Sequence, residues 1–463
     1  MPGVQPWPVV LFDGVWQSCL VIDLFTDPVV LDGLEIDWGR DEYMNHTGVG
    51  TLVLSWIDRT GQLAARMREK RMLGSQILVQ WADGLGTGAT MFQGRITGAA
   101  AEPDVPDPWA TDPEARCWRV TVHAADKTAD LGNIIQPAST WPRETMQARA
   151  AALNGASFIA GIQAFYFYPG HTDSVAWALD VKGRDNLSLL RDFYYSMGDT
   201  FTYLPAENVC RYLYRRAYHV WANLVQYDDG LIRMTANDQL VDGQRTYRGV
   251  GIQGCDVTSD DEAAVPINSA VTRVEASWKD TQNNDTDVVT TVYADEQSEL
   301  DRGRRTLTFT SWLGDGLRLD PVVLEVLNRG RFEGSQPKHP NITRDTRRTN
   351  GFYSRGEARA LLAGGETNAV LYVSGSQYAM WLFQVPFYAV IGGKIRWEHP
   401  GWIIDLNVQF HLATNTITPV RWNQMTNSLA WYEPPTVGAI VDSMTWFDAA
   451  FLQTGNVYVP TEI

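Results

Sequence analysis

Short runs of alternating apolar and polar residues fill the first part of this chain. Between residues 16 and 132, the runs GTLVLSWID, SQILVQWAD and CWRVTVHAAD are rich in β-branched and aromatic residues, and turn-forming residues separate them. A period of two is the pattern of strands with one buried face. Strands this short and this closely spaced are typical of a barrel or a sandwich. The pattern therefore predicts a β domain here.

The length of 463 residues is too great for one core, and similar strand patterns return in LIRMTAN, AVTRVEASWKD and WIIDLNVQFHL. We expect a mainly β (α+β) protein with two related β-barrel domains, at residues 1–135 and 220–415. A small α/β unit should lie between them at 136–219, and an extended C-terminal arm should follow at 416–463. A helix and a basic loop at about 320–365 are expected to interrupt the second barrel.

The α/β unit is predicted from the stretch GRDNLSLLRDFYYSMGDTFTYLPAENVCRYLY, residues 183–214. Asp185 or Asn186 can cap a helix, because a short side-chain oxygen there accepts a free first-turn N–H. Gly198 is expected to end the helix, and two alternating runs around PAEN predict a hairpin. One helical face is formed by residues spaced three and four apart: Leu187, Leu190, Tyr194 and Met197.

Three other segments have a local prediction. Residues 141–156 should form a helix with Pro142 in its first turn. The stretch GLGTGAT, residues 84–90, lacks the lysine of a phosphate loop and lies between two strands, so we interpret it as a hairpin loop. The Pro- and Asp-rich stretch at 101–115 should be an exposed loop.

Composition limits the kinds of partner. The formal net charge is −16 and the isoelectric point about 4.9, which opposes binding of nucleic acid by the general surface. Eighteen tryptophans suit cores, protein interfaces or sugar-binding platforms alike. The N-terminal residues lack the basic region of a signal peptide, and no stretch is apolar enough to span a bilayer. The cysteines have no CxxC spacing and are interpreted as free buried thiols, which fits a reducing cytoplasm: Cys19, Cys117, Cys210 and Cys255.

Motifs for chemistry are not found in the sequence. It has no GxSxG, HExxH or EF-hand pattern, and no two of its seven histidines are four residues apart. We therefore expect no catalytic residue, no metal and no cofactor. A triad assembled from distant residues stays open, because triads are recognised by geometry.

One segment is basic against the acidic background. Between residues 329 and 359 the chain has few acids, and the candidate partner- or DNA-facing residues are Arg329, Arg331, Lys338, Arg344, Arg347 and Arg348. Either this is a solvated loop, or it is a contact surface for an acidic neighbouring subunit or for DNA in transit.

The C-terminal arm lacks a sustained period of two or 3.6, yet it is too apolar for a free linker. Five aromatic residues are candidate inter-subunit anchors: Trp422, Trp431, Trp446, Phe447 and Phe451. The arm could also fold back on its own second barrel.

Several motifs in order resemble one protein family. They are WGRDEYMNHTGVGTLVLSWIDRTG with Gly39, Arg40, Asp58 and Gly61; MFQGRIT with Gly94 and Arg95; VTVHAADKTADLG with Asp126 and Leu131; and SELDRGRRTLTF with Ser298, Gly303 and Arg305. Over about residues 30–415 their order resembles the minor tail proteins of long-tailed phages, especially those of actinobacteria. Within that group the chain is similar to the central tail-tip, or baseplate, hub.

The resemblance implies a structural virion protein. Three copies would place six barrels in a ring, closing the tail tube, joining it to tip and receptor-binding proteins and forming part of the channel for viral genome ejection. Implied partners are the chain itself, as a homotrimer, the distal tail protein, the tape measure protein and other minor tail proteins. DNA would be a partner only in transit and the host envelope only indirectly. The location would be the virion tail tip, after assembly in the bacterial cytoplasm.

Other functions stay open beside the hub. The first alternative is a distal-tail ring protein, or a tail protein that binds a host receptor such as a cell-wall glycan. The second is a cell-wall hydrolase, although we expect no appended lytic domain.

Overall fold

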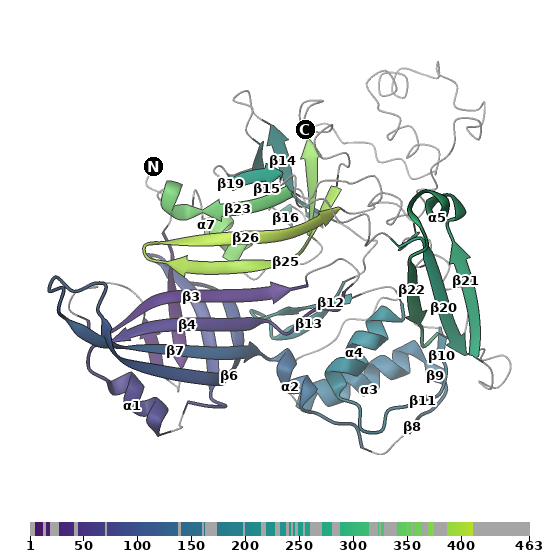
Figure 1. Ribbon diagram of the computed structural model, residues 1–463, viewed down its shortest axis with the longest axis horizontal. Helices are drawn as coiled ribbons and strands as arrows, with labels where there is room; N and C mark the ends of the chain where they lie inside the picture. The colour runs from purple at the N-terminus through teal and green to yellow at the C-terminus, as the bar shows by residue number, and fades with distance from the viewer. Residues whose placement is uncertain are drawn as a thin grey trace.

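Figure 1 shows the fold of the protein as a computed structural model. The structure describes residues 5–12, 15–18, 27–40, 45–69, 72–137, 140–159, 162, 174–197, 200–213, 219–226, 232–237, 240–241, 244–245, 249–252, 255–259, 271–279, 288–313, 323, 326–327, 340–349, 351–352, 355–362, 369–374 and 387–410. The expected C-terminal arm lies outside these residues.

The fold is mainly β, as predicted, and a 15-stranded sheet is its largest element. One path through the sheet is β18 (Gly249–Ile252), β15 (Ile232–Asn237), β14 (His219–Gln226), β24 (Ala369–Ser374), β25 (Phe387–Glu398), β3 (Val29–Gly39), β4 (Thr51–Asp58), β7 (Arg116–Asp126), β6 (Gly86–Pro106), β5 (Gln76–Asp83), β1 (Trp7–Phe12) and β2 (Val15–Ser18). A branch leaves β25 through β26 (Gly401–Phe410), β23 (Pro340–Asp345) and β19 (Cys255–Ser259).

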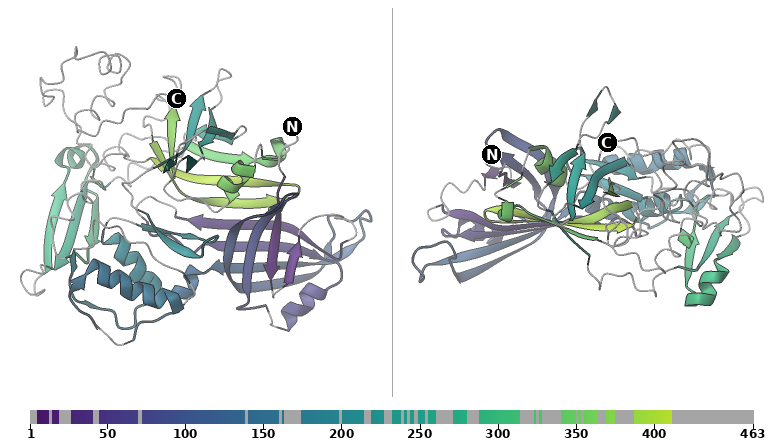
Figure 2. Two further views of the ribbon diagram at one scale, coloured as in Figure 1. Left: turned by 180° about the vertical axis from the view of Figure 1, so that it is seen from behind. Right: turned by 90° about the horizontal axis from the view of Figure 1, so that it is seen from above.

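The two expected β regions are joined within this sheet. Strand β3 pairs with β4 on one side and with β25 on the other, where Ile36 lies opposite Ile395. In the N-terminal part the sheet curls, so that Val10 and Ile77 share a core with Leu34 (Figure 2). Continuous pairing from Gly33 to Gly39 therefore makes the N-terminal and C-terminal strands one hydrogen-bonded body. The division into two related barrels stays a prediction.

Local signals in the N-terminal part account for its strands. In β4 the side chains of Leu52, Leu54 and Trp56 are buried and alternate with more exposed ones, as the period of two predicted. Residues 84–85 form the turn of the hairpin between β5 and β6, so GLGTGAT lies at a hairpin as interpreted, although residues 86–90 already belong to β6. Gly88 lies flat against the Trp81 ring, where a Cβ would clash. The expected loop at 101–115 is shorter than predicted, because β6 continues to Pro106.

The helix–hairpin unit packs beside the sheet. It contains α2 (Thr128–Gly132), α3 (Met146–Ile159), α4 (Asn186–Tyr195) and the hairpin of β12 (Thr200–Leu204) and β13 (Val209–Leu213). Asp185 caps α4, accepting a 2.8 Å hydrogen bond from the Ser188 N–H. All four predicted face residues of this helix are buried. Gly198, the expected end of the helix, lies outside the described residues.

The start of the first helix differs from its prediction. Residues 140–145 form two short strands, β8 (Thr140–Trp141) and β9 (Glu144–Thr145), so α3 begins only at Met146. These strands pair with β11 (Leu179–Asp180) and β10 (Val175–Ala176). Pairing with a distant segment thus outweighs the helix-start signal of Pro142.

A segment expected in the second β domain packs on the helix–hairpin unit instead. Strands β20 (Arg273–Lys279), β21 (Val288–Ala294) and β22 (Thr306–Thr310) form a separate three-stranded sheet with α5 (Glu296–Arg302), at the right of Figure 1. Its buried side chains, among them Val274 and Trp312, share a core with Phe193 of α4. Val323, Val326 and Leu327 are helical and lie in the same core. The span 220–415 therefore contributes to two cores rather than one.

The remaining elements lie around the sheet. They are α1 (Gln62–Arg68), the 3-10 helix η6 (Thr346–Thr349), α7 (Arg355–Leu362) and the small hairpin of β16 (Leu240–Val241) and β17 (Gln244–Arg245). Part of the expected basic insertion therefore belongs to the main β structure. Strand β23 is part of the large sheet, and Ala358, Leu361 and Leu362 of α7 lie in the core of that sheet.

Candidate functional site

The described residues offer no evident reaction centre. In this part of the chain no group of three His, Cys, Asp or Glu side chains could hold a metal ion. Two described histidines lie against aromatic rings: His46 against Tyr195, and His399 against Trp109 and Trp397. Cys117 and Cys210 are free and buried, as expected of structural thiols. Among the helices that the structure describes, none is long and apolar enough to cross a membrane.

The residues that carry the family resemblance lie where parts of the fold meet. Gly39 is at the β3–β25 contact, with a φ of 89° and with the backbone of Ile391 and Gly392 where a Cβ would lie. Arg40 is buried, its N–H donates to the Ile391 carbonyl at 3.0 Å, and its carbonyl accepts from Asn407 at 3.1 Å. The Gly-Arg pair therefore fixes the N-terminal strands against the C-terminal ones.

Asp58 and Gly61 shape the connection from β4 into α1. One Asp58 oxygen accepts from the Gly61 N–H at 2.8 Å, and the other accepts from the N–H groups of Leu63 and Ala64 at 2.8 and 3.0 Å. Gly61 has a φ of 72°, a conformation that glycine adopts without cost. The fully buried carboxylate thus satisfies the free first-turn donors of the helix.

Gly94 and Arg95 hold β6 against β7 and α2. At Gly94 a Cβ would overlap the Ala125 carbonyl, so only glycine allows this approach of the two strands. Arg95 reaches across to Asp130 with a 3.1 Å ion pair and donates to the Gly74 carbonyl at 3.2 Å.

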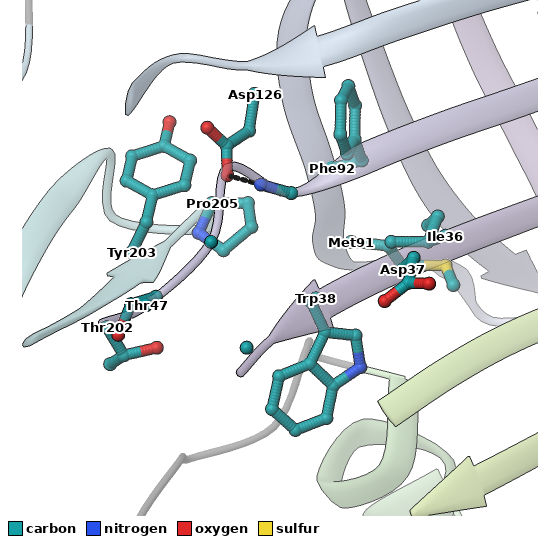
Figure 3. Close-up of a pocket in the computed structure, with 13 residues that line it drawn as sticks. Ile36, Asp37, Trp38, Thr47, Met91, Phe92, Asp126, Thr202, Tyr203 and Pro205 are labelled. Carbon is teal, nitrogen blue, oxygen red and sulfur yellow. Dashed lines mark hydrogen bonds between the residues drawn. The ribbon is translucent and has the colours of Figure 1, made fainter. Parts of the chain in front are cut away.

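Asp126 lies at the junction of the sheet with the helix–hairpin unit, beside a cavity of about 30 Å³ (Figure 3). One carboxyl oxygen accepts from the Gly50 N–H at 2.7 Å, and the other accepts from the Thr128 N–H at 2.8 Å. Burial raises the pKa of this carboxyl to about 6, although these hydrogen bonds oppose the rise. Leu131, the second residue of this motif, is fully buried in the core of the helix–hairpin unit.

The last motif closes α5 and joins β22 to β20. The Ser298 hydroxyl donates to the capping residue Asp295 at 2.7 Å, and Gly303 ends the helix with a φ of 84°. The Arg305 carbonyl accepts from the N–H groups of Thr272 and Arg273, each at 3.0 Å. Ser298 and Gly303 therefore fix the two ends of α5, and Arg305 fixes the start of β22 beside β20.

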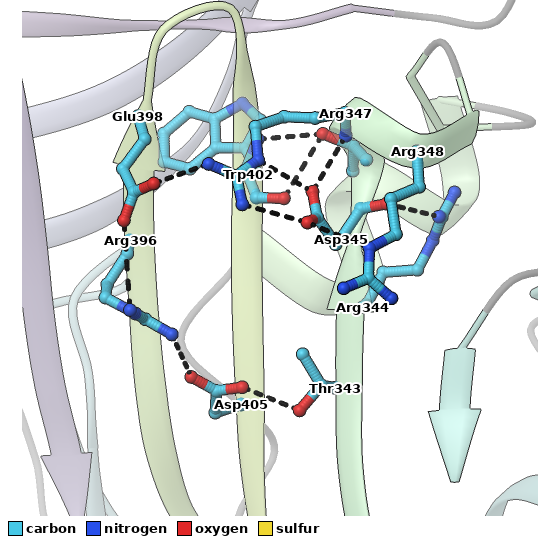
Figure 4. Close-up of polar contacts among 10 residues, drawn as sticks. Thr343, Arg344, Asp345, Arg347, Arg348, Arg396, Glu398, Trp402 and Asp405 are labelled. Atoms are coloured by element: carbon cyan, nitrogen blue, oxygen red, sulfur yellow. Dashed lines mark hydrogen bonds and ion pairs between the residues drawn. The ribbon is translucent and has the colours of Figure 1, made fainter.

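The described part of the basic segment is largely paired within the chain (Figure 4). Arg344 is buried, donates to the Gly351 carbonyl at 2.9 Å and lies over the Phe352 ring, so it does not belong to an outward-facing surface. Arg347 pairs with Asp345 at 2.9 Å and with Glu398 at 2.5 Å. Arg348 is 70% exposed and lies 3.5 Å from Asp345. Arg329, Arg331 and Lys338 lie outside the described residues.

The outward face of the joined sheet carries a row of paired acidic and basic side chains that ends in a hydroxyl. Lys394 of β25 lies 3.3 Å from Glu35 and 3.4 Å from Asp37 of β3. Arg396 pairs with Asp405 of β26 at 2.6 Å, and Asp405 also accepts from Thr343 of β23 at 2.7 Å. This row, which we call the charged ladder, consists of Glu35, Asp37, Lys394, Arg396, Asp405 and Thr343. It links strands from both ends of the chain.

Sequence reasoning missed Arg149 at the centre of the helix–hairpin unit. The guanidinium is fully buried, 5.5 Å from the ring centroids of both Trp141 and Trp312, and it pairs with Glu144 at 3.1 Å. It also donates to the carbonyls of Pro142 and Trp177 at 2.9 and 3.1 Å. The one sequence signal for this arrangement is an arginine among the alanines of the first half of α3.

The five predicted anchors belong to the C-terminal arm. Trp422, Trp431, Trp446, Phe447 and Phe451 all lie outside the residues that the structure describes.

Comparison with known proteins gives similar structures but no family. No family model and no curated protein matches the chain. A tail protein from Neisseria meningitidis MC58 is 12% identical with a TM-score of 0.48, over 87% of this chain and 95% of that one. The 43 kDa tail protein of prophage MuSo2 from Shewanella oneidensis is 13% identical with a TM-score of 0.47, over 87% and 96%. The E. coli c3393 protein, described as a type VI secretion component similar to the T4 tail proteins gp27 and gp5, is 10% identical with a TM-score of 0.44, over 88% and 77%.

Proposed function

We propose that this chain is a structural protein of a phage tail tip, the hub that closes the tail tube and links it to the tip proteins. The observation that carries the proposal is the position of the resemblance motifs. Gly39 and Arg40 join β3 to β25, Asp126 meets the helix–hairpin unit, and Gly303 closes α5. A hub needs residues that fix its parts relative to one another, and this is what the motif residues do.

The charged ladder supports a role in which DNA passes without being held. Its two cations already have carboxylate partners on neighbouring strands. Binding to DNA gains its free energy from neutralising phosphates with available Lys and Arg. A surface of paired charges on an acidic chain offers little of this, so DNA would be a partner in transit only.

Three copies would form a ring with a central channel for DNA, since cyclic symmetry closes a ring of identical chains. In the virion the ring would contact the distal tail protein, the tape measure protein and other minor tail proteins. The exposed Arg348, with Arg329, Arg331 and Lys338, would face one of these neighbours, and the aromatic residues of the arm would anchor to another. These contacts belong to the proposal and rest on the resemblance.

The mass of the assembled complex tests the proposal. Native mass spectrometry of the chain, purified alone and together with its tail neighbours, should find three copies of the 51.8 kDa chain. Six copies would favour a distal-tail ring instead. Turnover of isolated cell wall by the purified chain would favour the hydrolase and would contradict a purely structural role.

A further inference from the structure

An apolar groove of about 530 Å³ lies between α1 and the strands β6 and β7. Its volume is within the range of sites that enclose a ligand or a large side chain. No charged residue is among the described residues that line it. Five alanines form most of the lining, two from α1 and three from β6: Ala64, Ala65, Ala99, Ala100 and Ala101.

The groove is open because most of its lining side chains are small. Ala65 is exposed on the α1 side and Ala100 on the β6 side. Contiguous exposed apolar surface of this kind marks an interaction site. Four of the lining residues pack on the core of the large sheet and yet stay partly exposed: Met67, Ala99, Ala101 and Trp118.

Trp118 forms a wall of the groove beside the start of α1. Gly61 has a φ of 72°, and a Cβ there would lie 3.1 Å from the Trp118 Nε1, so the indole lies against the first turn of the helix. Among the residues that the structure describes, the indole N–H has no hydrogen-bond partner. The groove thus offers an apolar floor, an aromatic wall and one available donor. These fit an aromatic side chain and a peptide carbonyl beside it.

The sequence beyond Phe410 supplies such a side chain. Trp422 is the first of the five predicted anchors, and it has no local pattern of strand or helix around it that would bury its ring. The 12 residues from Phe410 to Trp422 span at most roughly 40 Å when fully extended. This reach decides which groove the ring can enter.

The groove of the same copy is at the limit of that reach. Strand β26 ends at Phe410, at the opposite end of the sheet from α1 (Figure 1). Following the register from Phe410 through β25, β3, β4 and β7 to Ala101 gives about ten steps along the strands and five strand spacings across them. At about 3.3 Å per step and about 4.8 Å per spacing, the separation is roughly 40 Å. A path over the surface is longer than this straight line, so a neighbouring copy is the more accessible partner.

Charge at the β6 side of the groove complements the arm. Glu102 is exposed beside the groove alanines and forms no ion pair among the described residues. Arg421, next to Trp422, is the only Lys or Arg in the C-terminal arm. On the α1 side, Arg66 and Glu69 already have partners within the chain. An exposed pair of Arg421 with Glu102 contributes mainly to the orientation of the segment.

We propose that the segment around Trp422 of one copy enters the groove between α1 and β6 of the neighbouring copy, an inference that rests on the proposed trimer. The Trp422 ring lies on the alanines beside Trp118, where it buries its apolar surface and makes an aromatic contact. Each arm links one copy to the next, so three such contacts close the ring. The later aromatic residues of the arm stay available for another tail protein.

Cross-linking of the full chain tests this contact. Ala65→Cys places a thiol in the groove, Asn423→Cys places one beside Trp422, and a short bismaleimide links the two. We expect covalent dimers and trimers of the 51.8 kDa chain on a denaturing gel, because the two thiols belong to different copies. Ala151→Cys, at an exposed position of α3, combined with Asn423→Cys should give none. Wild-type chain treated in the same way measures linkage through the natural cysteines.

Native mass spectrometry of the same samples separates the two proposals. A trimer in which the thiols link only within one copy, or do not link, overturns the docking and leaves the trimer standing. A chain that stays monomeric refutes the trimer and the docking with it. In assembled tails, a link from the groove thiol to a different tail protein would assign the groove to that protein and would also overturn the docking.

Trypsin gives a second readout, because Arg421 provides the single cleavage site of the arm. Ala65→Phe fills the groove from an exposed position and should release the segment. We expect the fragment that begins at Trp422 to appear about tenfold faster, which corresponds to about 1.4 kcal/mol of lost docking free energy. Ala151→Phe, the same change on α3, should leave the rate unchanged. Equal rates in all three trimers would contradict the docking, and if Ala65→Phe does not fold, the cross-link still decides.

Discussion

At the scale of single residues, the junctions depend on glycines that face a neighbouring backbone. Gly94 is the sharpest case, because the Ala125 carbonyl occupies the place of its absent side chain. Gly98 lies three register pairs further along the same strands, and a Cβ there would meet only the His123 side chain at 3.8 Å. The same chemical change at the two positions therefore has different consequences.

We predict that Gly94→Ala lowers the free energy of unfolding by about 1–3 kcal/mol, the usual cost of forcing atoms into a packed site. Gly98→Ala should change it by less than about 0.5 kcal/mol, as expected of a substitution without a clash. Urea unfolding followed by tryptophan fluorescence measures both. Equal losses in the two variants would show that the close approach at Gly94 is not needed.

A second residue-scale prediction concerns Asp345. Its hydrogen bonds to Arg347 hold the pKa of the carboxyl below its ordinary value of 3.8. A lowered pKa in the folded state contributes stability that is present above the unfolded value and is lost as the pH falls through the folded value. Asp345→Asn should therefore cost about 1–3 kcal/mol at pH 7 and progressively less below about pH 4.

Unfolding of this variant is measured at several pH values beside Asp112→Asn, a control in an exposed loop. A loss that does not depend on pH would mean that the charge of Asp345 is not what stabilises η6.

At the scale of elements, the sequence predicted those whose signals are local. The cap at Asp185, the face of α4 and the hairpin at residues 84–90 follow from neighbouring residues alone, and all three are confirmed. The start of α3 was predicted too early, because β8 and β9 pair with segments 30 to 40 residues away in the sequence. The packing of residues 271–279 and 288–313 on α4 could not be predicted either, since the alternation in their strands fits any buried sheet face.

Arg149 supplies the element-scale prediction. It connects Glu144, Pro142 and Trp177 while lying between Trp141 and Trp312, so it holds distant segments of the unit together. Arg149→Met keeps the volume but leaves Glu144 and two carbonyls without this partner. We expect a loss of about 3 kcal/mol, at the low end for a broken buried pair because Glu144 is 20% exposed.

Differential scanning calorimetry compares this variant with Arg143→Met, whose arginine is exposed on the preceding turn. An unchanged melting temperature for Arg149→Met would refute the central role of its guanidinium.

At the scale of the whole molecule, the mainly β fold could be predicted, but the continuity of the sheet could not. Pairing of residues 33–39 with 392–398 depends on how the chain returns, and no local pattern encodes it. The Gly39–Arg40 pair was noticed through the resemblance, yet its place at this contact appears only in three dimensions. The same holds for the candidate site. The order of the motifs along the sequence indicated which residues were important, but it did not show that these residues join the sheet to the helix–hairpin unit and the N-terminal strands to the C-terminal ones.

The C-terminal arm gives a prediction at this scale. Deleting residues 416–463 should leave the unfolding of the remaining chain nearly unchanged, because we expect the arm to gain its order from other chains. Incorporation of the truncated chain into tails should fail, and a phage complementation assay with gradient-purified particles measures it. A truncated chain that does not fold would instead place the arm in the core of its own subunit.

The symmetry of the chain within the assembled tail tip tests the hub most directly. Cryo-electron microscopy of intact particles, with the chain located by a fused density marker, counts its copies around the tail axis. The account predicts three copies around a central channel, with β3 and β25 paired within each copy. Six copies in a ring, or a peripheral position away from the axis, would contradict it.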